Sequence, residues 1–189
     1  MTKIAIFASG RGSNARKIIE YFQDKADVSI ALIVSNKQDA PVLELASSHQ
    51  ISSLVIHKPS FYHSDVIIEE LRSFDIDFIV LAGFLWLIPE YLVKAYPKRI
   101  INIHPALLPA YGGKGMYGMN VHRAVQKAQE QHSGITIHYV NENYDEGNIL
   151  FQARCEVTQQ DSAEDIAKKV QALEHQYFPP IIEAVLPIG

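Results

Sequence analysis

The sequence has little of several features that mark particular classes of protein. It contains one cysteine, Cys155, so an internal disulfide cannot form, and no cluster of ligands indicates structural zinc. No apolar segment approaches the roughly 20 residues that a membrane-spanning helix needs. Lysine and arginine form no run and the net charge is -4, so the electrostatic footprint of a protein that binds nucleic acid or a membrane surface is missing.

The remaining composition is that of an ordinary globular protein. Of 189 residues, 48% are hydrophobic and 20% are charged, which suits one domain with a substantial core. The first residues, MTKIAIFASGRGSN, contain too short an apolar stretch for a signal peptide, and glycine and arginine interrupt it. We therefore expect a cytoplasmic protein with a single domain over residues 1–189.

Short apolar runs alternate with segments of helical periodicity along most of the chain. We expect strands at residues 3–9, 28–35, 52–57, 77–84 and 99–104. We expect helices at residues 14–23, 41–50, 89–96, 120–130 and from a cap at Ser64 or Asp65 to residue 74. This alternation predicts an α/β, Rossmann-like fold with a mostly parallel central sheet and helices on both faces.

The pattern changes toward the C-terminal end. Two strands, at residues 134–140 and 148–157, are joined by the short turn-rich loop NENYDEG, which predicts an antiparallel extension of the sheet. From Ser162, apolar residues are spaced as one face of a long final helix. Pro179 and Pro180 are expected to kink or end this helix, because proline lacks the amide hydrogen that continues it.

The stretch ASGRGSNA follows the first expected strand and opens the first helix. Glycines there leave backbone N–H groups free to point at an anion, and the helix dipole adds to that preference. Gly10, Gly12 and Ala15 also match a loose dinucleotide pattern, but residues 35–37 read Ser-Asn-Lys and lack the carboxylate that binds ribose. The alternative is a tight turn with an asparagine as helix cap. We favour a single phosphate held by three consecutive residues: Gly12, Ser13 and Asn14.

The stretch LAGFLWLIP leaves the end of a buried strand with Gly83 at the exit. Ligands of open parallel sheets bind outside the carboxyl ends of the strands, so this loop lies in the right place. Its apolar residues are expected to form the wall of a pocket for a flat ring, the alternative for each being core packing: Leu85, Trp86, Leu87 and Ile88.

Two polar side chains stand in the apolar strand RIINIH. Asn102 and His104 are two residues apart, so they point to the same face of the strand. Unpaired burial would cost about 1–3 kcal/mol for each group, so partners are expected. An imidazole with a pKa of about 6.5 can act as an acid or a base near neutral pH. Five other histidines show nothing beyond a structural or exposed position: His57, His63, His122, His132 and His175.

The stretch NENYDEGN joins the two C-terminal strands and contains Asp145. Read alone, this is an ordinary turn aspartate. His138 lies on the strand that leads into the loop, and we expect it to support the site as a neighbour of the catalytic groups.

Taken in order, the motifs SGxGSN, LAGF, NIHPxLLP, DxG and QxxEHxxxP cover nearly the whole chain, which resembles the formyltransferase family that uses 10-formyltetrahydrofolate. GRGSN and the length resemble the branch that acts on a ribonucleotide, because the tRNA-formylating branch needs a further C-terminal domain and the deformylase branch an N-terminal regulatory one. The resemblance implies transfer of a formyl group to the amine of glycinamide ribonucleotide in purine biosynthesis.

The resemblance also implies roles for particular residues. The catalytic group would be Asn102, His104 and Asp145. Residues that would bind the ribonucleotide are Gly12, Ser13, Asn14, Gly83, Ile103, Pro105 and Glu174. Residues that would bind the folate are Leu85, Trp86, Leu87, Ile88, Asn102, Val140 and the segment from Asn141 to Asp145. The phosphate-binding half would span about residues 1–100 and the folate-binding, catalytic half about residues 101–189.

The chemistry implied by the resemblance needs neither a metal nor a covalent nucleophile. Asn102 and a protonated His104 would stabilise the negative oxygen of a tetrahedral intermediate, and Asp145 would keep His104 charged and hold a water that relays a proton. Many family members carry arginine where this chain has Trp86, which would exchange a polar contact with folate for stacking. The long loop 111–120 would cover the phosphate or ribose, with Lys114 as a further phosphate contact.

Three other functions fit parts of the pattern. A formyltetrahydrofolate hydrolase would use water as the formyl acceptor, but it leaves the phosphate loop unexplained. A nucleotide-binding oxidoreductase would use Gly10, Gly12 and Ala15, but the ribose carboxylate is missing. A binding module that has lost its chemistry would not need the intact catalytic group. Small-molecule substrates are expected in each case, with no nucleic acid and no membrane as partners.

Overall fold

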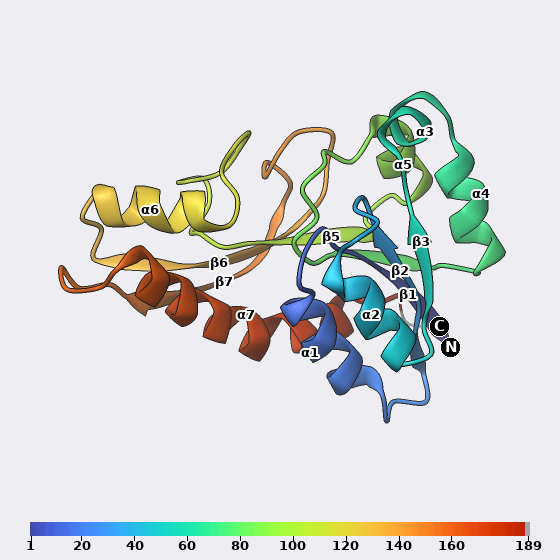
Figure 1. Cartoon of the computed structure of the whole chain (residues 1–189), viewed down its shortest axis with the longest axis horizontal. Helices are drawn as coiled ribbons and strands as arrows, with labels where there is room; N and C mark the ends of the chain where they lie inside the picture. The colour runs from blue at the N-terminus through green and yellow to red at the C-terminus, as the bar shows by residue number, and fades with distance from the viewer. Residues whose placement is uncertain (188–189) are drawn as a thin grey trace.

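The computed structural model describes residues 1–187, which form one seven-stranded sheet with strand order β3-β2-β1-β4-β5-β6-β7 (Figure 1). The strands are β1 (Thr2–Phe7), β2 (Val28–Ser35), β3 (Ser52–Val55), β4 (Phe78–Leu81), β5 (Ile100–His104), β6 (His132–Tyr139) and β7 (Ile149–Glu156). β1 to β5 pair in parallel, whereas β6 pairs antiparallel with both β5 and β7. The expected mostly parallel sheet with an antiparallel C-terminal extension is confirmed.

Helices cover both faces of the sheet. They are α1 (Ser13–Phe22), α2 (Pro41–Ser48), α3 (Lys58–His63), α4 (Val66–Ser73), α5 (Glu90–Ala95), α6 (Met119–Lys127) and α7 (Ala163–Val185). α1, α2 and α7 pack on one face with inward residues such as Ile4 and Ile6, and α3, α4 and α5 pack on the other with Ala5 and Phe7 (Figure 1). Because successive strand residues point to opposite faces, each buried strand contributes side chains to both cores, as its continuous apolar sequence predicts.

Three local expectations needed correction. α3 was not expected; it begins after His57 with a proline in its first turn and buries Phe61. Asp65 occupies the cap position of α4, but its side chain makes no capping hydrogen bond. Pro179 and Pro180 lie inside α7 and do not end it, because the helix continues to Val185 and buries residues on both sides of the prolines.

The two ends of α7 are held in different ways. At its start, Ser162 and Asp165 form a capping box, in which each side chain bonds the other residue's backbone N–H. Toward its end, Phe178 and Ile182 are fully buried in the same core as α1, which offsets the backbone hydrogen bonds that the prolines cannot make.

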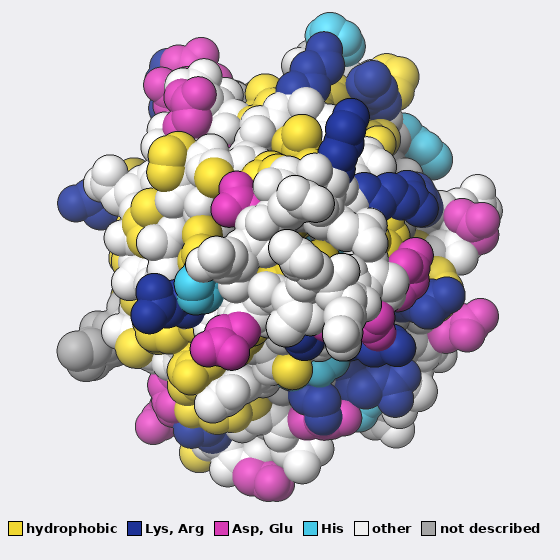
Figure 2. All heavy atoms as spheres, turned by 90° about the vertical axis from the view of Figure 1, so that its left-hand side faces the viewer, with side chains coloured by type: hydrophobic (Ala, Val, Ile, Leu, Met, Phe, Trp, Pro, Cys, Tyr) yellow, Lys and Arg dark blue, Asp and Glu magenta, His cyan; other side chains and the backbone are white. Residues whose placement is uncertain are grey.

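The surface mixes charges of both signs. Figure 2 views the side that carries α6 and the start of α7, where basic and acidic side chains are interspersed with apolar ones. Among residues 1–187, none of the helices combines the length and the hydropathy required of a membrane span.

Candidate active site

The first part of the site is the start of α1. Gly12 is the N-cap residue and has a φ of 72°, a left-handed conformation that favours glycine. A Cβ at this position would also lie 2.6 Å from Val42 Cγ2, so a side chain does not fit. The cap is therefore Gly12 and not Asn14. The first N–H groups of a helix lack internal acceptors, so those of Ser13 and Asn14 are available to an anion.

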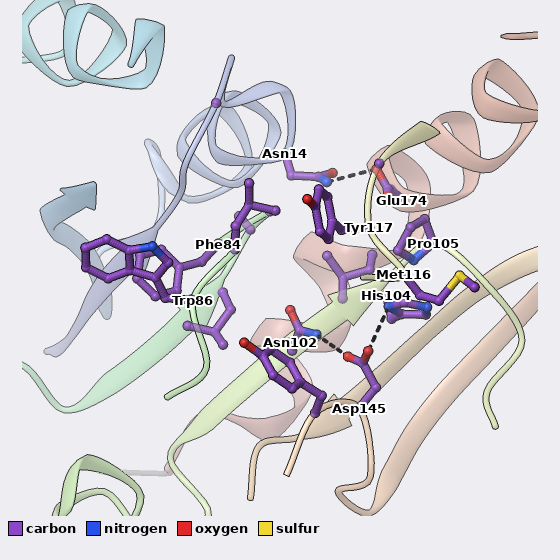
Figure 3. A pocket seen from close by; sticks show the side chains of 18 of the residues that line it. Asn14, Phe84, Trp86, Asn102, His104, Pro105, Met116, Tyr117, Asp145 and Glu174 are labelled. Atoms are coloured by element: carbon purple, nitrogen blue, oxygen red, sulfur yellow. Dashed lines mark hydrogen bonds and ion pairs between the residues drawn. The ribbon is translucent and has the colours of Figure 1, made fainter. Parts of the chain in front are cut away.

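Asn14 links this helix start to the final helix. Its Nδ2 donates to Glu174 Oε2 at 2.9 Å, as Figure 3 shows. Asn14 Oδ1 is buried and has no hydrogen-bond partner among residues 1–187. Burial raises the pKa of Glu174, and the hydrogen bond from Asn14 offsets part of that increase. An acceptor without a partner and a carboxyl group thus meet beside the start of α1, where hydroxyl groups of a ligand can bond to them.

The second part of the site is the loop after β4. Gly83 has a φ of 79°, and its carbonyl accepts a hydrogen bond from Ser9 N–H, while Ser9 Oγ accepts one from Leu85 N–H at 2.9 Å. These bonds join the first glycine loop to the apolar loop. Trp86 packs in an aromatic group with Phe61 and Phe84, at centroid distances of 5.7 and 6.2 Å. The indole is therefore held in place at the cavity wall.

The third part of the site joins β5 to the loop after β6. Asn102 pairs with His138 across the antiparallel strands, and its Nδ2 lies 3.1 Å from His138 Nε2 and 3.4 Å from Asp145 Oδ1. The Nδ1 atom of His138 lies 2.9 Å from the carbonyl oxygen of Tyr139. A carbonyl oxygen can only accept, so the proton of a neutral His138 lies on Nδ1, and its Nε2 accepts from Asn102.

His104 lies on the same face of β5 as Asn102 and is 4% exposed. Its Nδ1 is 3.4 Å from Asp145 Oδ2 (Figure 3), and its Nε2 is 2.8 Å from the carbonyl oxygen of Tyr111. The Tyr111 carbonyl requires a donor, so a neutral His104 carries its proton on Nε2. Its Nδ1 is then an unprotonated nitrogen that faces Asp145. The structure thus brings Asn102, His104 and Asp145 together, as the resemblance to the formyltransferases implies.

The expectation that Asp145 keeps His104 charged stays a prediction, because two opposing effects act on the pKa of His104. Burial lowers the pKa of His104 below its usual range, and Asp145 and the Tyr111 carbonyl offset only part of that effect. Burial on its own would raise the pKa of Asp145, but His138, the charge of His104 and the N–H of Gly113 lower it instead. Burial therefore disfavours the charged imidazole, while the carboxylate of Asp145 lies where it would stabilise that charge once it forms.

Asp145 reaches this position because its loop folds tightly against β6. A Cβ on Gly147 would lie 1.6 Å from the carbonyl oxygen of Tyr139, so only glycine allows this approach. Asp145 itself has a φ of 56°, and its Oδ2 accepts a hydrogen bond from Gly113 N–H at 3.0 Å. The carboxylate is held from two loops that are distant in the sequence.

Buried Thr136 fixes the chain that follows His104. Its hydroxyl donates to the carbonyl of Ala106 at 2.7 Å and accepts from the N–H of Leu108 at 2.9 Å. Gln152 on β7 donates to the same oxygen at 2.8 Å. Nothing in the sequence pattern indicates this bonding, which depends on the register between β5, β6 and β7.

All three parts line one cavity of about 880 Å³. One end of the cavity lies between the start of α1 and the first half of α7. From there it runs past His104 to the apolar loop after β4 (Figure 3). Every residue named individually for the site lines it except Asn141, whose side chain accepts from Asn143 N–H within its own loop. Lys114 also lines it, as part of the loop that leads into α6. Met116 and Tyr117 belong to the loop 111–120 and Asn143 and Tyr144 to the segment 141–145, both expected at the site. Lining residues that no motif indicates include Phe84, His122, Val170 and Gln171.

These features define a class of protein: a doubly wound α/β fold with a large cavity at the carboxyl ends of its parallel strands and acid–base groups at the cavity floor. A family model described as formyl transferase matches residues 2–182. The chain belongs to this formyl transferase family.

Named relatives agree with the family. The chain is 46% identical over 189 residues to phosphoribosylglycinamide formyltransferase, chloroplastic, of Arabidopsis thaliana, which covers 97% of this chain and 65% of that protein. It is 38% identical over 194 residues to the Bacillus subtilis phosphoribosylglycinamide formyltransferase, covering 100% of this chain and 97% of the relative. The chain thus spans less than two thirds of the plant relative and nearly all of the bacterial one.

Solved structures share the fold. The crystal structure of phosphoribosylglycinamide formyltransferase from Bacillus halodurans superposes with a TM-score of 0.87 at 34% identity, covering 97% of this chain and 95% of that one. Glycinamide ribonucleotide transformylase 1 from Symbiobacterium toebii gives a TM-score of 0.88 at 30% identity, covering 100% of this chain and 91% of that one.

Proposed function

We propose that the protein transfers a formyl group from 10-formyltetrahydrofolate to the amine of glycinamide ribonucleotide in purine biosynthesis. The observation that carries the proposal is a single cavity in which His104 and Asp145 lie between an anion-binding helix start and an apolar wall. The names of the relatives support it. A cavity of about 880 Å³ lies at the upper end of the range of about 300–1,000 Å³ for ligand sites, as two substrates require.

Each end of the cavity suits one substrate. The N–H groups at the start of α1 would bind the phosphate of the ribonucleotide, with Lys114 nearby, and Asn14 and Glu174 would bond to its hydroxyl groups. The loop Leu85–Ile88 and Val140 would hold the flat ring of the folate. Because Trp86 already packs on Phe61 and Phe84, we propose that it forms a fixed wall of the folate site.

The positions of the ring nitrogens of His104 support one route for the transferred proton. The amine would attack the formyl carbon, and its proton would move to the unprotonated Nδ1 of His104, directly or through a water held by Asp145. The resulting imidazolium would be stabilised by the Asp145 carboxylate. It would return the proton to N10 of the folate as the bond between carbon and N10 breaks.

Asn102 would stabilise the oxyanion of the tetrahedral intermediate. Its hydrogen bond to Asp145 is long at 3.4 Å, so this N–H is weakly held and can turn to a stronger acceptor. The bond from Asn102 to His138 keeps the amide in position meanwhile. The products are the formylated ribonucleotide and tetrahydrofolate.

The test is an assay with both substrates that follows the release of tetrahydrofolate. The proposal predicts product only when glycinamide ribonucleotide and 10-formyltetrahydrofolate are both present. Formate released without the ribonucleotide would instead show a hydrolase. The cytoplasmic location remains a prediction, and the name of the Arabidopsis relative assigns that protein to the chloroplast.

A further inference from the structure

His122 is a cavity-lining imidazole that the proposed mechanism does not use. It lies on α6, is 6% exposed and lines the same cavity as His104. Its Nδ1 is buried and has no hydrogen-bond partner among residues 1–187. An unpaired polar atom in a buried position lowers stability, so a histidine here needs a reason other than packing.

The surroundings of His122 fix where its proton lies. Burial lowers the pKa of His122, and the nearby His104 lowers it further, which favours the neutral ring. A buried N–H without an acceptor is rarer in proteins than an acceptor without a donor. The proton therefore lies on Nε2, the other ring nitrogen, and the lone pair lies on the unpaired Nδ1.

His122 belongs to the ribonucleotide side of the cavity. α6 packs against α7, which contributes Gln171 and Glu174 to the cavity wall. The loop that leads into α6 contributes Met116 and Tyr117, which in Figure 3 lie toward His104 and Asn14, away from Trp86. An N–H donor on this wall faces a ligand rich in oxygen atoms.

We propose that His122 donates a hydrogen bond from Nε2 to an oxygen of the ribonucleotide substrate and so contributes to the affinity for that substrate. The inference rests on the proposed function, since it takes the ribonucleotide as the ligand of this side. It makes His122 a substrate-binding residue beyond those that the sequence motifs indicate.

The test replaces His122 with phenylalanine, which keeps a ring and removes both nitrogens. The KM for glycinamide ribonucleotide should rise about tenfold, the value of one net hydrogen bond, with the KM for folate and kcat nearly unchanged. The melting temperature should stay the same or rise, because the unpaired Nδ1 is removed. His122→Gln, which restores an N–H donor, should recover most of the affinity.

A matched control is available on α7. His175 also has a buried nitrogen, Nε2, without a partner among residues 1–187, but it does not line the cavity. His175→Phe should therefore leave both KM values unchanged. A purely structural role of buried histidines would make the two variants behave alike.

Calorimetric titration with glycinamide ribonucleotide, without folate, separates this proposal from the proposed function. Weaker binding by His122→Phe and normal binding by His175→Phe would support the contact even if turnover were absent. Equal dissociation constants for wild type and a folded His122→Phe variant would overturn it. A wild type that binds the ribonucleotide but transfers no formyl group would refute the proposed function alone.

Discussion

Replacing Gly147 with alanine should displace Asp145 although it removes no polar side chain from the site; the added Cβ would also lie 3.3 Å from His138 Nδ1. The added Cβ would lie 1.6 Å from the carbonyl oxygen of Tyr139, where side chains in proteins stay beyond 3.0 Å. The loop would therefore have to move by about 1.4 Å away from β6. His104 Nδ1 and Asp145 Oδ2 are already 3.4 Å apart, so the shift would break their contact. A misplacement of about 1 Å costs up to about 10²-fold in rate, which is the expected loss in kcat.

The assay is steady-state kinetics of formyl transfer, with a thermal melt to confirm that the variant folds. Folding should survive, because residues 141–148 lie in the connection between β6 and β7, outside both cores. Glu146→Ala is the matched control; this exposed neighbour should retain near-normal kcat. A folded Gly147→Ala variant with the turnover of the wild type would show that the position of Asp145 does not matter, and the reasoning would fail.

Three further predictions concern the reacting groups. Asn102→Ala should lower kcat by about 10²–10³-fold, the usual loss of an oxyanion donor, and rates within tenfold of the wild type would exclude that role. The rate should fall on the acid side as His104 becomes protonated; because burial lowers its pKa, this limb should lie below the unperturbed value of 6.5, and a pH–rate profile of kcat/KM measures it. Asp145→Asn removes a group that raises the pKa, so the remaining activity should show its limb at still lower pH.

The local parts of the site are visible in the sequence because each depends on short-range geometry. The two-residue spacing of Asn102 and His104 is enough to place both on one face of β5. The apolar strands predict a parallel sheet, and the carboxyl ends of those strands define where a ligand binds. A glycine pair before a helix likewise predicts the start of α1 at Gly12, whose free N–H groups are suited to an anion.

The parts that depend on contacts between distant segments are less visible. Asp145 looks like a turn aspartate until the close approach of Gly147 to Tyr139 is known. His122 has no motif around it, and its place in the cavity follows from the packing of α6 on α7. The same reason explains Pro179 and Pro180: buried neighbours hold α7 together through residues that on local propensity should end it.

The pKa of His104 likewise depends on packing that the sequence does not reveal. The sequence indicates a carboxylate near the imidazole, which on its own raises the pKa. Whether burial or the carboxylate has the larger effect on this pKa depends on how deeply the ring is buried, and His104 is 4% exposed. Burial therefore outweighs the carboxylate and favours an imidazole that accepts a proton rather than one that starts out charged.

The turnover number of His104→Ala with both substrates at saturation tests the central claim most directly. If the imidazole carries the proton between the two nitrogens, kcat should fall by about 10²–10⁴-fold, the usual contribution of general acid–base catalysis, with the fold intact by thermal melt. Normal turnover by a folded protein without this side chain would contradict the account.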